Sequence, residues 1–578
     1  MTLLLGLMLL AVTPAAQSAA AQSGPQASAP FVLAGGTGAQ QSPSLAGGIM
    51  AYTHCRAGDC DIYTMDLATR KAAPLAEGSW DEEQPHTDGQ RVVWRDERSA
   101  AAGGSSALSN TDLFGANLSD RKPYPVSRAR RMQTTPRVWG NYAVWADFRT
   151  ARDVHDQEAG DVYLFDIPGG TETPIAAARS AQVRPAIAGD YVVWADYRNE
   201  PDPNGTNADI YAYHIPTARE FAVSTAPGTQ TDPAISGNIV VWADYRTGQG
   251  DIYAYDLAAG REFAVSTSPG SQTQPAVWGN VVVWADWRND PGGERGIDSD
   301  IYAYDLTTRR EFPVYVGPGR QLAPSTAAGL VAWEDYARGN SDPDVMGATL
   351  PGIPLNAPPA PPPLLPGAGS RLFPETGKAV TGVFLDHWTR NGGLAQQGFP
   401  ISGVITETSA LDGKVYTVQY FERAVFEYHP ENPPPHNVLL AQLGTFRLRG
   451  RYPSGPPAPP SPIATSTATP TAAATVTGTM SITPTAVPIP PPSRLFAETG
   501  KTVSGRFLQY WEQHGGLAQQ GYPISEPFVE VSEVDGRPYL VQYFERAVFE
   551  YHPENPPPGD VLLSLLGSFV YRQRYPSP

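Results

Sequence analysis

The sequence contains few basic residues. Lys and Arg together number 41 among 578 residues, whereas Asp and Glu number 58, so the formal net charge at pH 7 is −17. A chain this acidic offers no basic surface for phosphate groups, which argues against nucleic acid as a partner. Basic and neutral ligands remain open.

Long apolar runs are also missing. The one apolar stretch near the start, Leu3 to Val12, is too short for a membrane span of about 20 residues, so we expect no transmembrane segment. Small residues suited to cleavage follow it, and residues 1–22 are therefore predicted to be a signal peptide, although no Lys or Arg precedes Arg56. No Cys lies directly after the apolar stretch, which argues against a lipoprotein anchor. We expect a secreted protein, either extracellular or associated with the cell surface.

Cysteine is nearly absent, with only Cys55 and Cys60 in the chain. In an exported protein, one close pair favours a disulfide that clamps a single turn. A metal site is the alternative, but it needs more ligands, and only His54 lies beside the pair.

Known catalytic and metal-binding motifs are absent too. The sequence has no Gly-x-Ser-x-Gly, no His-Glu-x-x-His and no Asp-x-Asp-x-Asp-Gly loop. We therefore predict no catalytic residue, no metal ligand and no cofactor. Acidic loop residues leave Ca²⁺ open without a motif to support it, and solvated turns are the alternative: Asp153, Asp156, Glu158, Asp202, Asp290 and Asp298.

What the sequence does contain is a repeat, which we aligned on the aromatic residue of "VVW". Seven units follow, and in each a proline precedes the aromatic residue by 9 positions. A later Asp opens "DIY" or its equivalent, and the next proline comes 24 positions after that Asp in all six cases. The aromatic residues are Tyr52, Trp94, Trp145, Trp194, Trp242, Trp284 and Trp333.

Each unit contains four short β-branched and aromatic segments separated by turn residues, as in "PAISG", "VVWADYR", "DIYAYDL" and "REFAVST". Four-stranded units of about 40 to 50 residues, repeated radially, are typical of a β-propeller. We therefore predict a mainly β fold with a propeller at residues 31–350, seven-bladed, or six-bladed if a divergent terminal unit does not form a blade. The seventh unit lacks a fourth strand, and residues 31–43 align with that strand elsewhere, so the N-terminal strand is expected to close the last blade.

The repeated pattern "P…G…V-x-W-x-D…D-I-Y-x-x-D-L" resembles the TolB-type, WD-like propeller repeat across residues 31–350. This resemblance implies the fold and says little about function. The extra N-terminal domain of TolB is absent, which puts the Tol role in doubt.

Repetition also separates scaffold from site. The Asp of "WAD", the Arg that follows it and the Asp of "DIY" recur in most units, so we interpret them as scaffold. Binding residues are expected where the units differ, on variable loops and at the start of each innermost strand, near the channel mouth. A hydrated channel without a ligand is the alternative. The candidate binding residues are Gln84, His86, Thr135, Arg137, Arg184, Asp232 and Gln274.

The C-terminal part contains a duplicated module. A Pro-rich linker, residues 351–370, precedes copy 1 at residues 371–453, and a Pro/Thr/Ala-rich linker, residues 454–493, precedes copy 2 at residues 494–578. Both copies contain "QYFERAVFEYHPENPPP". We predict a small α+β fold for each, with a hairpin in this run and a short helix in "DVLLSLLG".

Two features of the modules bear on function. The runs "GGLAQQGFPIS" and "GGLAQQGYPIS" resemble LGFP-type repeats of secreted bacterial proteins, a resemblance that implies association with the cell envelope and cell-wall polysaccharide as a partner. Glu427, His429 and Glu431 alternate along one predicted strand, an arrangement compatible with metal binding but common on exposed strands.

Two functions follow from these features. The preferred one is a secreted or cell-surface binding protein whose propeller loops recognise a peptide, protein or glycan, with tail modules that associate with the envelope. The alternative is a propeller-type glycan hydrolase or lyase that uses carboxylates at the channel mouth.

Overall fold

A computed structural model describes most of the chain, and its placed residues fall into the following ranges. They are 26–98, 110–150, 160–178, 180–199, 207–290, 297–337, 339, 342–353, 357–358, 360–363, 365–409, 412–453 and 492–575. The predicted signal peptide and most of the linker at 454–493 lie outside them. The chain divides into two compact units, residues 1–85 with 226–358 and residues 86–225 with 359–578.

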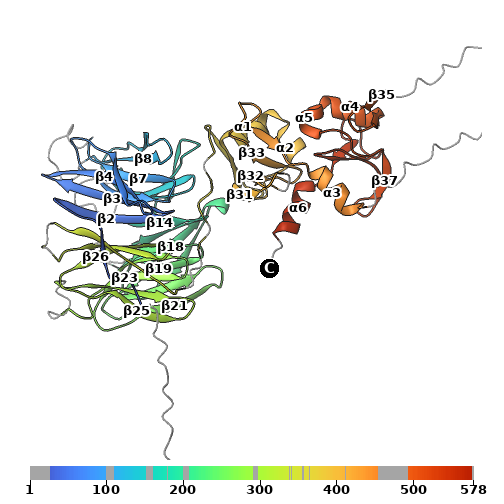
Figure 1. The fold of residues 1–578 in the computed structure, drawn as a ribbon. Helices are drawn as coiled ribbons and strands as arrows, with labels where there is room; N and C mark the ends of the chain where they lie inside the picture. The colour runs from blue at the N-terminus through green and yellow to red at the C-terminus, as the bar shows by residue number, and fades with distance from the viewer. Residues whose placement is uncertain are drawn as a thin grey trace, which may run out of the picture. The chain divides into compact units, whose positions relative to one another are not determined.

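Within the described residues between Phe31 and Thr349, the strands form seven four-stranded antiparallel sheets (Figure 1). The mainly β propeller class is confirmed, and the count of blades in a closed ring stays a prediction. Four sheets belong to the first unit. They are β2 (Ala39–Ala46), β3 (Ile49–Arg56), β4 (Asp59–Asp66) and β5 (Lys71–Ala76); β18 (Gln230–Ser236), β19 (Ile239–Asp244), β20 (Asp251–Asp256) and β21 (Arg261–Ser266); β22 (Gln272–Trp278), β23 (Val281–Asp286), β24 (Asp300–Asp305) and β25 (Arg310–Tyr315); and β26 (Gln321–Ala327), β27 (Leu330–Asp335), β28 (Asp344–Thr349) and β1 (Phe31–Ala34).

The remaining three sheets have the same strand order. They are β6 (Glu82–Thr87), β7 (Arg91–Asp96), β8 (Asp112–Asn117) and β9 (Pro123–Ser127); β10 (Gln133–Trp139), β11 (Tyr142–Asp147), β12 (Asp161–Asp166) and β13 (Thr171–Ala176); and β14 (Gln182–Ala188), β15 (Tyr191–Asp196), β16 (Asp209–His214) and β17 (Arg219–Ser224), with the 3-10 turn η2 (Ile215–Thr217) before β17.

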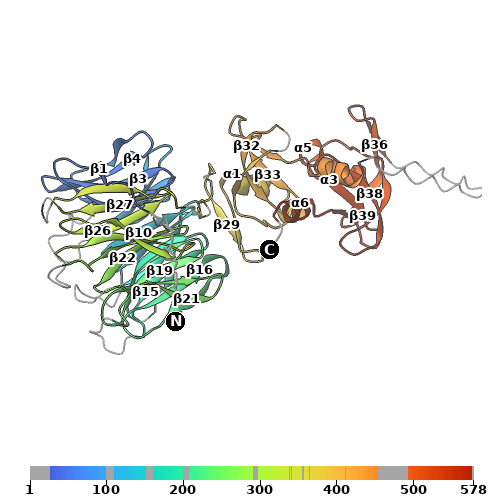
Figure 2. The same ribbon diagram turned by 60° about the horizontal axis from the view of Figure 1, so that its bottom comes forward.

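The N-terminal strand completes the last sheet, as the sequence predicts. β1 pairs antiparallel with β28, with Phe31 opposite Gly347 and Val32 opposite Met346. The sheet order is therefore β1-β28-β27-β26, and three of these strands are labelled in Figure 2. Pairing of the two ends of the repeat covers a strand edge that would otherwise be open.

Each sheet has a buried core built on the repeated aromatic residue. In β19, Trp242 is fully buried, and its ring stacks on Tyr253 of β20 with centroids 6.4 Å apart. Trp145, Trp194 and Trp284 stack in the same way on Tyr163, Tyr211 and Tyr302. Buried aromatic pairs of this kind add about 0.5–1.5 kcal/mol beyond their burial, so the repeated motif accounts for the repeated sheet.

A β-bulge recurs in the first strand of the sheets. In β18, the pairing with β19 shifts between Thr231 and Ala234, so Asp232 and Pro233 share one partner position. Proline has no N–H to donate to the ladder, and a bulge accommodates that loss. The residue before the proline takes a left-handed backbone in all seven described sheets, with these φ angles: Ser42 54°, Gln84 53°, Thr135 50°, Arg184 55°, Asp232 53°, Gln274 53° and Ala323 48°.

The two tail modules have the predicted α+β class. Copy 1 contains β29 (Ser370–Phe373), β30 (Lys378–Thr381), α1 (Gly382–Arg390), α2 (Gly393–Gln397), β31 (Ile405–Thr408), β32 (Val415–Tyr420), β33 (Val425–Tyr428), β34 (Val438–Leu440) and α3 (Leu443–Arg451). Copy 2 repeats them as β35 (Ser493–Phe496), β36 (Lys501–Ser504), α4 (Gly505–Gln513), α5 (Gly516–Gln520), β37 (Phe528–Val531), β38 (Pro538–Tyr543), β39 (Val548–Tyr551), β40 (Val561–Leu563) and α6 (Leu566–Arg574).

One expected element differs. The run "DVLLSLLG" was expected to form a helix, but Val561–Leu563 forms strand β40, and the helix begins only at Leu566. These residues form a strand rather than a helix because β40 pairs with β39, with Phe549 opposite Leu563, and so extends the sheet by one strand.

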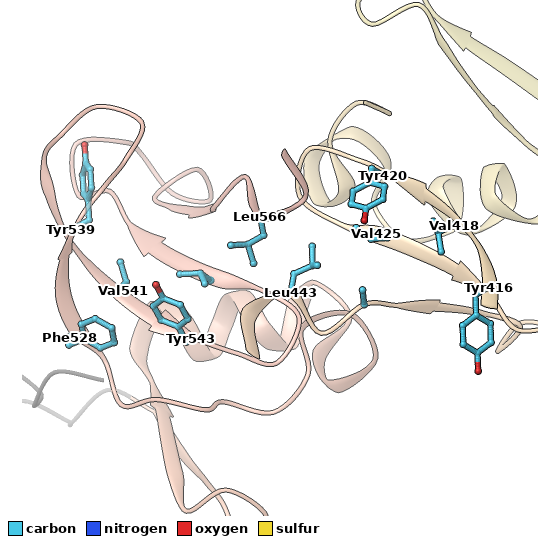
Figure 3. Packing of buried hydrophobic residues seen from close by; sticks show 12 residues of the cluster. Tyr416, Val418, Tyr420, Val425, Leu443, Phe528, Tyr539, Val541, Tyr543 and Leu566 are labelled. Carbon is cyan, nitrogen blue, oxygen red and sulfur yellow. The ribbon is translucent and has the colours of Figure 1, made fainter. Parts of the chain in front are cut away.

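The two copies share one hydrophobic core (Figure 3). Leu443 of α3 and Leu566 of α6 lie between the copy 1 sheet and the copy 2 sheet, in a cluster that contains Tyr420 and Tyr543. Each helix contacts the strand of the other copy, α3 with β38 and α6 with β32. The modules are therefore not separate bodies on a tether: they exchange their C-terminal helices.

Hydrogen bonds follow the same exchange. The N–H of Thr445 donates to the carbonyl of Glu545, at 3.1 Å, and the N–H of Ser568 donates to the carbonyl of Glu422, at 3.0 Å. Glycine is required where each helix crosses, because a Cβ at Gly444 would lie 1.8 Å from the Phe544 carbonyl oxygen. Gly567 stands in the same relation to Phe421.

Candidate binding site

The repeated polar residues bond to one another inside four of the described sheets. In β19, the buried Asp244 accepts from Trp242 Nε1 at 2.9 Å and from Arg246 Nε at 2.8 Å and Nη2 at 2.7 Å. The Arg246 guanidinium lies 4.0 Å from the centroid of Tyr253 and pairs with Glu262 at 2.9 Å. The same set recurs as Trp145, Asp147, Arg149 and Glu172; Trp194, Asp196, Arg198 and Glu220; and Trp284, Asp286, Arg288 and Glu311.

The charged groups of this network are paired with one another inside the sheet, as expected for a structural role. Its hydrogen bond to Asp244 raises the pKa of Arg246 above its usual value, so the guanidinium stays charged. The Asp that opens the third strand is engaged as well: Asp251 accepts from Thr247 Oγ1 at 2.8 Å, while burial raises its pKa. Groups that satisfy each other within a sheet are not available to a ligand.

Three of the predicted binding residues lie in the first unit, each directly before the proline of its strand with a left-handed backbone. Gln84 and Asp232 are half-buried, and Gln274 is exposed. The Oε1 of Gln274 accepts from the N–H of Ala323, the bulge residue of β26, at 2.9 Å. Thus one bulge side chain caps the strained backbone of another.

The other four predicted residues lie in the second unit, and the structure brings two of them together. His86 Nδ1 accepts from the N–H of Val138 at 3.2 Å, and Arg137 is the neighbouring cation. Burial, assisted by Arg137, holds the pKa of His86 well below its usual value, so the imidazole is neutral at pH 7. Thr135 is half-buried beside Arg137 on β10, and Arg184 on β14 is exposed.

Sequence reasoning missed two charged residues in the second strands. Glu334 of β27 is buried where most sheets have Ala, and it accepts from the N–H of Ser42 at 2.7 Å and from Tyr336 Oη at 2.8 Å. Burial raises the pKa of Glu334. Arg95 of β7 occupies the matching position and pairs with Glu97 at 3.0 Å. The signal was in the sequence: "WED" and "WRD" depart from the repeated "WAD".

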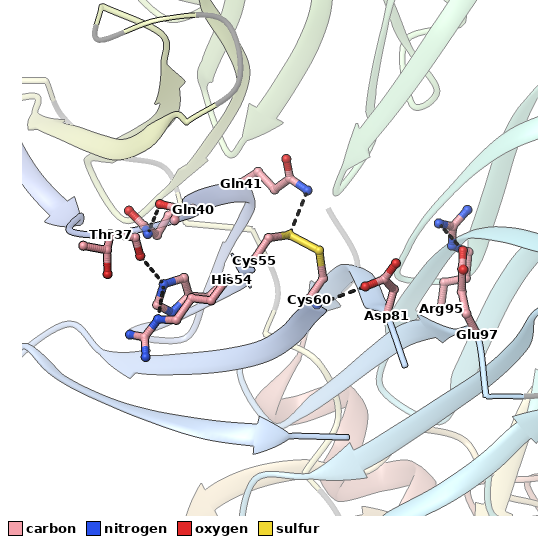
Figure 4. The surroundings of a disulfide bond; sticks show 11 residues. Thr37, Gln40, Gln41, His54, Cys55, Cys60, Asp81, Arg95 and Glu97 are labelled. Atoms are coloured by element: carbon pink, nitrogen blue, oxygen red, sulfur yellow. Dashed lines mark hydrogen bonds and ion pairs between the residues drawn. A yellow bond between two sulfur atoms is a disulfide. The ribbon is translucent and has the colours of Figure 1, made fainter. Parts of the chain in front are cut away.

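The two cysteines form a disulfide across the β3–β4 hairpin (Figure 4). Cys55 and Cys60 face each other in the strand register, with Cα atoms 3.9 Å apart. The N–H of Cys60 donates to Asp81 Oδ1 at 3.0 Å, and His54 Nε2 lies 3.2 Å from the Thr37 carbonyl oxygen. The bond therefore closes one hairpin.

Within the described residues, no helix has the length and apolar character needed to cross a bilayer. Nor do they contain a group of three or more His, Cys, Asp or Glu side chains arranged to hold a metal ion. Asp153, Asp156, Glu158 and Asp202 lie outside the described residues.

No family model matches the chain, and no curated protein matches it. Among solved structures, it is similar to an oligogalacturonate lyase in complex with manganese, at 14% identity over 53% of this chain and 87% of that one, with a TM-score of 0.39. It is also similar to a putative TolB from Agrobacterium tumefaciens, at 17% identity over 50% and 98%, with a TM-score of 0.34.

A third similar structure is the β-propeller domain of the Trilobed protease from Pyrococcus furiosus. It matches at 12% identity over 55% of this chain and 96% of that one, with a TM-score of 0.40. Identities and scores at this level do not assign a function.

Proposed function

We propose that this chain is an exported binding protein whose sheets present variable side chains at a fixed, strained backbone position. The proposal rests on one observation: the residue before the repeated proline has a left-handed backbone conformation in each described sheet. A non-glycine residue in this region costs about 1–3 kcal/mol and tends to persist at functional positions. The backbone is constant across the sheets, while the side chain varies among Ser, Gln, Thr, Arg, Asp and Ala.

The ligand is a peptide, protein or neutral or basic glycan. The net charge of −17 favours basic or neutral surfaces. The bonded acidic and basic residues are alike from sheet to sheet, so specific recognition is assigned to the positions and loops that differ. Among the seven candidate residues, Asp232 is the only carboxylate, which gives paired acid/base chemistry little support.

Export and envelope association form part of the proposal. A disulfide between Cys55 and Cys60 supports an oxidising compartment, where such bonds persist. The tail modules are proposed to hold the protein at the envelope as one paired body, because their shared core joins them.

The test is a peptide and glycan array probed with the full chain, followed by affinity measurements on the best ligand. Arg184→Ala and Asp232→Ala are each expected to weaken binding about tenfold or more with an unchanged melting temperature, since hydrogen bonds to charged groups contribute about 1.5–3 kcal/mol. Exposed Arg219→Ala, in the same sheet as Arg184, is the control and should bind normally. Equal binding by all three variants would contradict the proposal.

A further inference from the structure

A cavity of about 220 Å³ lies in the tail where copy 2 completes copy 1. One wall is the copy 1 sheet, with Tyr416, Tyr420 and Glu427; another is α6 of copy 2, with Val570 and Arg574. Phe446 of α3 contributes an aromatic ring. The cavity is therefore a product of the helix exchange.

The two carboxylates that line the cavity differ in their bonding. Glu407 accepts from Tyr420 Oη at 2.9 Å and from Arg574, so its charge is matched by the protein. Glu427 has a side chain only 14% exposed, and its Oε2 lies 3.5 Å from His429 Nε2. This low exposure leaves its charge poorly solvated, and burial raises the pKa of Glu427.

Copy 2 shows how the same carboxylate is satisfied elsewhere in the chain. Glu550, the counterpart of Glu427, accepts a hydrogen bond from Ser564 Oγ at 2.5 Å. The counterpart of Ser564 in copy 1 is Ala441, which lines the cavity and has no hydroxyl to donate. A donor from a ligand would replace the missing one.

Copy 2 also shows what kind of group fits this place. Arg447 of α3 lies with its guanidinium 3.8 Å from the centroid of Phe569 and pairs with Glu533 at 2.5 Å. Its side chain is only 11% exposed. In copy 1 the matching pair is Val570 and Phe446, so the ring is present and the cation is not. The counterpart of Glu533 is Ala410 in sequence, so Glu427 is the carboxylate that would face a cation in the copy 1 cavity.

We propose that the copy 1 cavity binds a small organic cation, an ammonium or guanidinium group on a short apolar chain. The cationic group lies in the cavity that Phe446 and Glu427 both line, against the Phe446 ring. Its apolar chain lies on Val418 and Leu443. Aromatic rings and a poorly solvated carboxylate together favour such a cation over a neutral isostere. This site is independent of the proposed propeller function, and either can fail alone.

The experiment measures binding of n-butylammonium, n-butylguanidinium and neutral n-butanol to the full chain by calorimetry and ligand-observed NMR. Both cations are expected to bind at one site per chain, at least about tenfold more tightly than butanol. Blocked lysine and arginine, with their termini capped, form a second arm: tighter binding of these identifies a peptide side chain as the source, and weaker binding identifies a free amine.

Variants test the position of the site. Glu427→Gln should weaken cation binding about tenfold or more, whereas the matched Glu550→Gln in copy 2 should leave it within about twofold. Val570→Arg should fill the cavity and abolish binding. If that variant is misfolded, a second variant tests the same position. The double change Arg447→Val with Ser564→Ala gives copy 2 the residue types that stand at these places in copy 1, so the number of cation sites per chain should rise from one to two.

Three results would overturn the proposal: no cation binding to the wild-type chain, equal binding of butanol, or equal loss in Glu427→Gln and Glu550→Gln.

Discussion

The repeated sheets and the duplicated tail modules solve the same problem in different ways. In four of the described sheets, the Trp, Asp, Arg and Glu of one repeat bond to one another, so these repeats satisfy the polar groups of the motif internally. In the tail, neither copy is complete alone, because α3 and α6 cover each other's sheets. The comparison shows that repetition in sequence does not decide whether repeats are self-sufficient.

Breaking one sheet network should have the largest effect. Asp244→Ala removes the acceptor of Trp242 Nε1 and leaves Arg246 without its buried partner, so we expect a loss of about 3–5 kcal/mol in the free energy of unfolding. Urea denaturation followed by tryptophan fluorescence measures it. The control is Glu262→Gln, the outer partner of Arg246, which is expected to cost less than about 1 kcal/mol. Similar losses in both variants would show that the network is not centred on Asp244.

The stability of the tail should fall in acid because of His387, which copy 1 has and copy 2 does not. Burial lowers the pKa of His387 from 6.5 to about 4. Because the unfolded chain takes up a proton first, the stabilisation is present above pH 6.5 and is lost as the pH falls toward 4. At about 1.4 kcal/mol per pKa unit, the loss approaches about 3 kcal/mol.

The matched variant is His387→Tyr, since Tyr510 occupies this position in copy 2. Tail unfolding measured from pH 7 to pH 4 should be less acid-sensitive in the variant. Identical pH profiles would contradict the role of His387.

Adding a side chain where helix α3 crosses copy 2 should destabilise the paired tail modules. Gly444→Ala places a Cβ against the Phe544 carbonyl, and overpacking of this kind costs about 1–3 kcal/mol. Gly450→Ala, in the same helix with open space around it, should instead stabilise by about 0.5–1 kcal/mol. Thermal unfolding of the tail measures both, and stabilisation by both changes would argue against a close crossing.

Relief of backbone strain should have the smallest effect. Ala323 has a φ of 48°, and glycine adopts that conformation without steric cost, so Ala323→Gly should stabilise by about 0.5–1 kcal/mol. Ala332→Gly, in the buried middle of β27, should destabilise. Chemical denaturation of the two variants should therefore shift in opposite directions.

The sequence was sufficient for the features that repeat at fixed spacing. The constant 9- and 24-residue intervals predicted the strands of each sheet, and the gapless fit of residues 31–43 predicted that β1 would pair with β28. Both follow from local patterning, because buried strands need regular apolar residues and turns need fixed lengths.

Two features were not predictable in the same way. A residue before proline is normally extended, so the left-handed Asp232 and its equivalents run against the local rule, and only the bulge in the ladder explains them. The helix exchange leaves no local mark either, because two nearly identical modules look the same in sequence whether they pack together or stay apart. Gly444 and Gly567 are needed where the helices cross. The sequence alone does not show this need, because the carbonyl oxygens that a Cβ would meet belong to the other copy.

The exchanged helices also set an order of events when the protein is made. Leu443 and its partner Leu566 are 123 residues apart, so at about 5–20 residues per second the first module emerges roughly 6–25 s before the helix that covers it. During that interval its apolar sheet is open to other nascent chains or to chaperones. The tail can therefore finish folding only after the whole polypeptide has been made. A truncated product would expose an apolar surface to which other chains could bind.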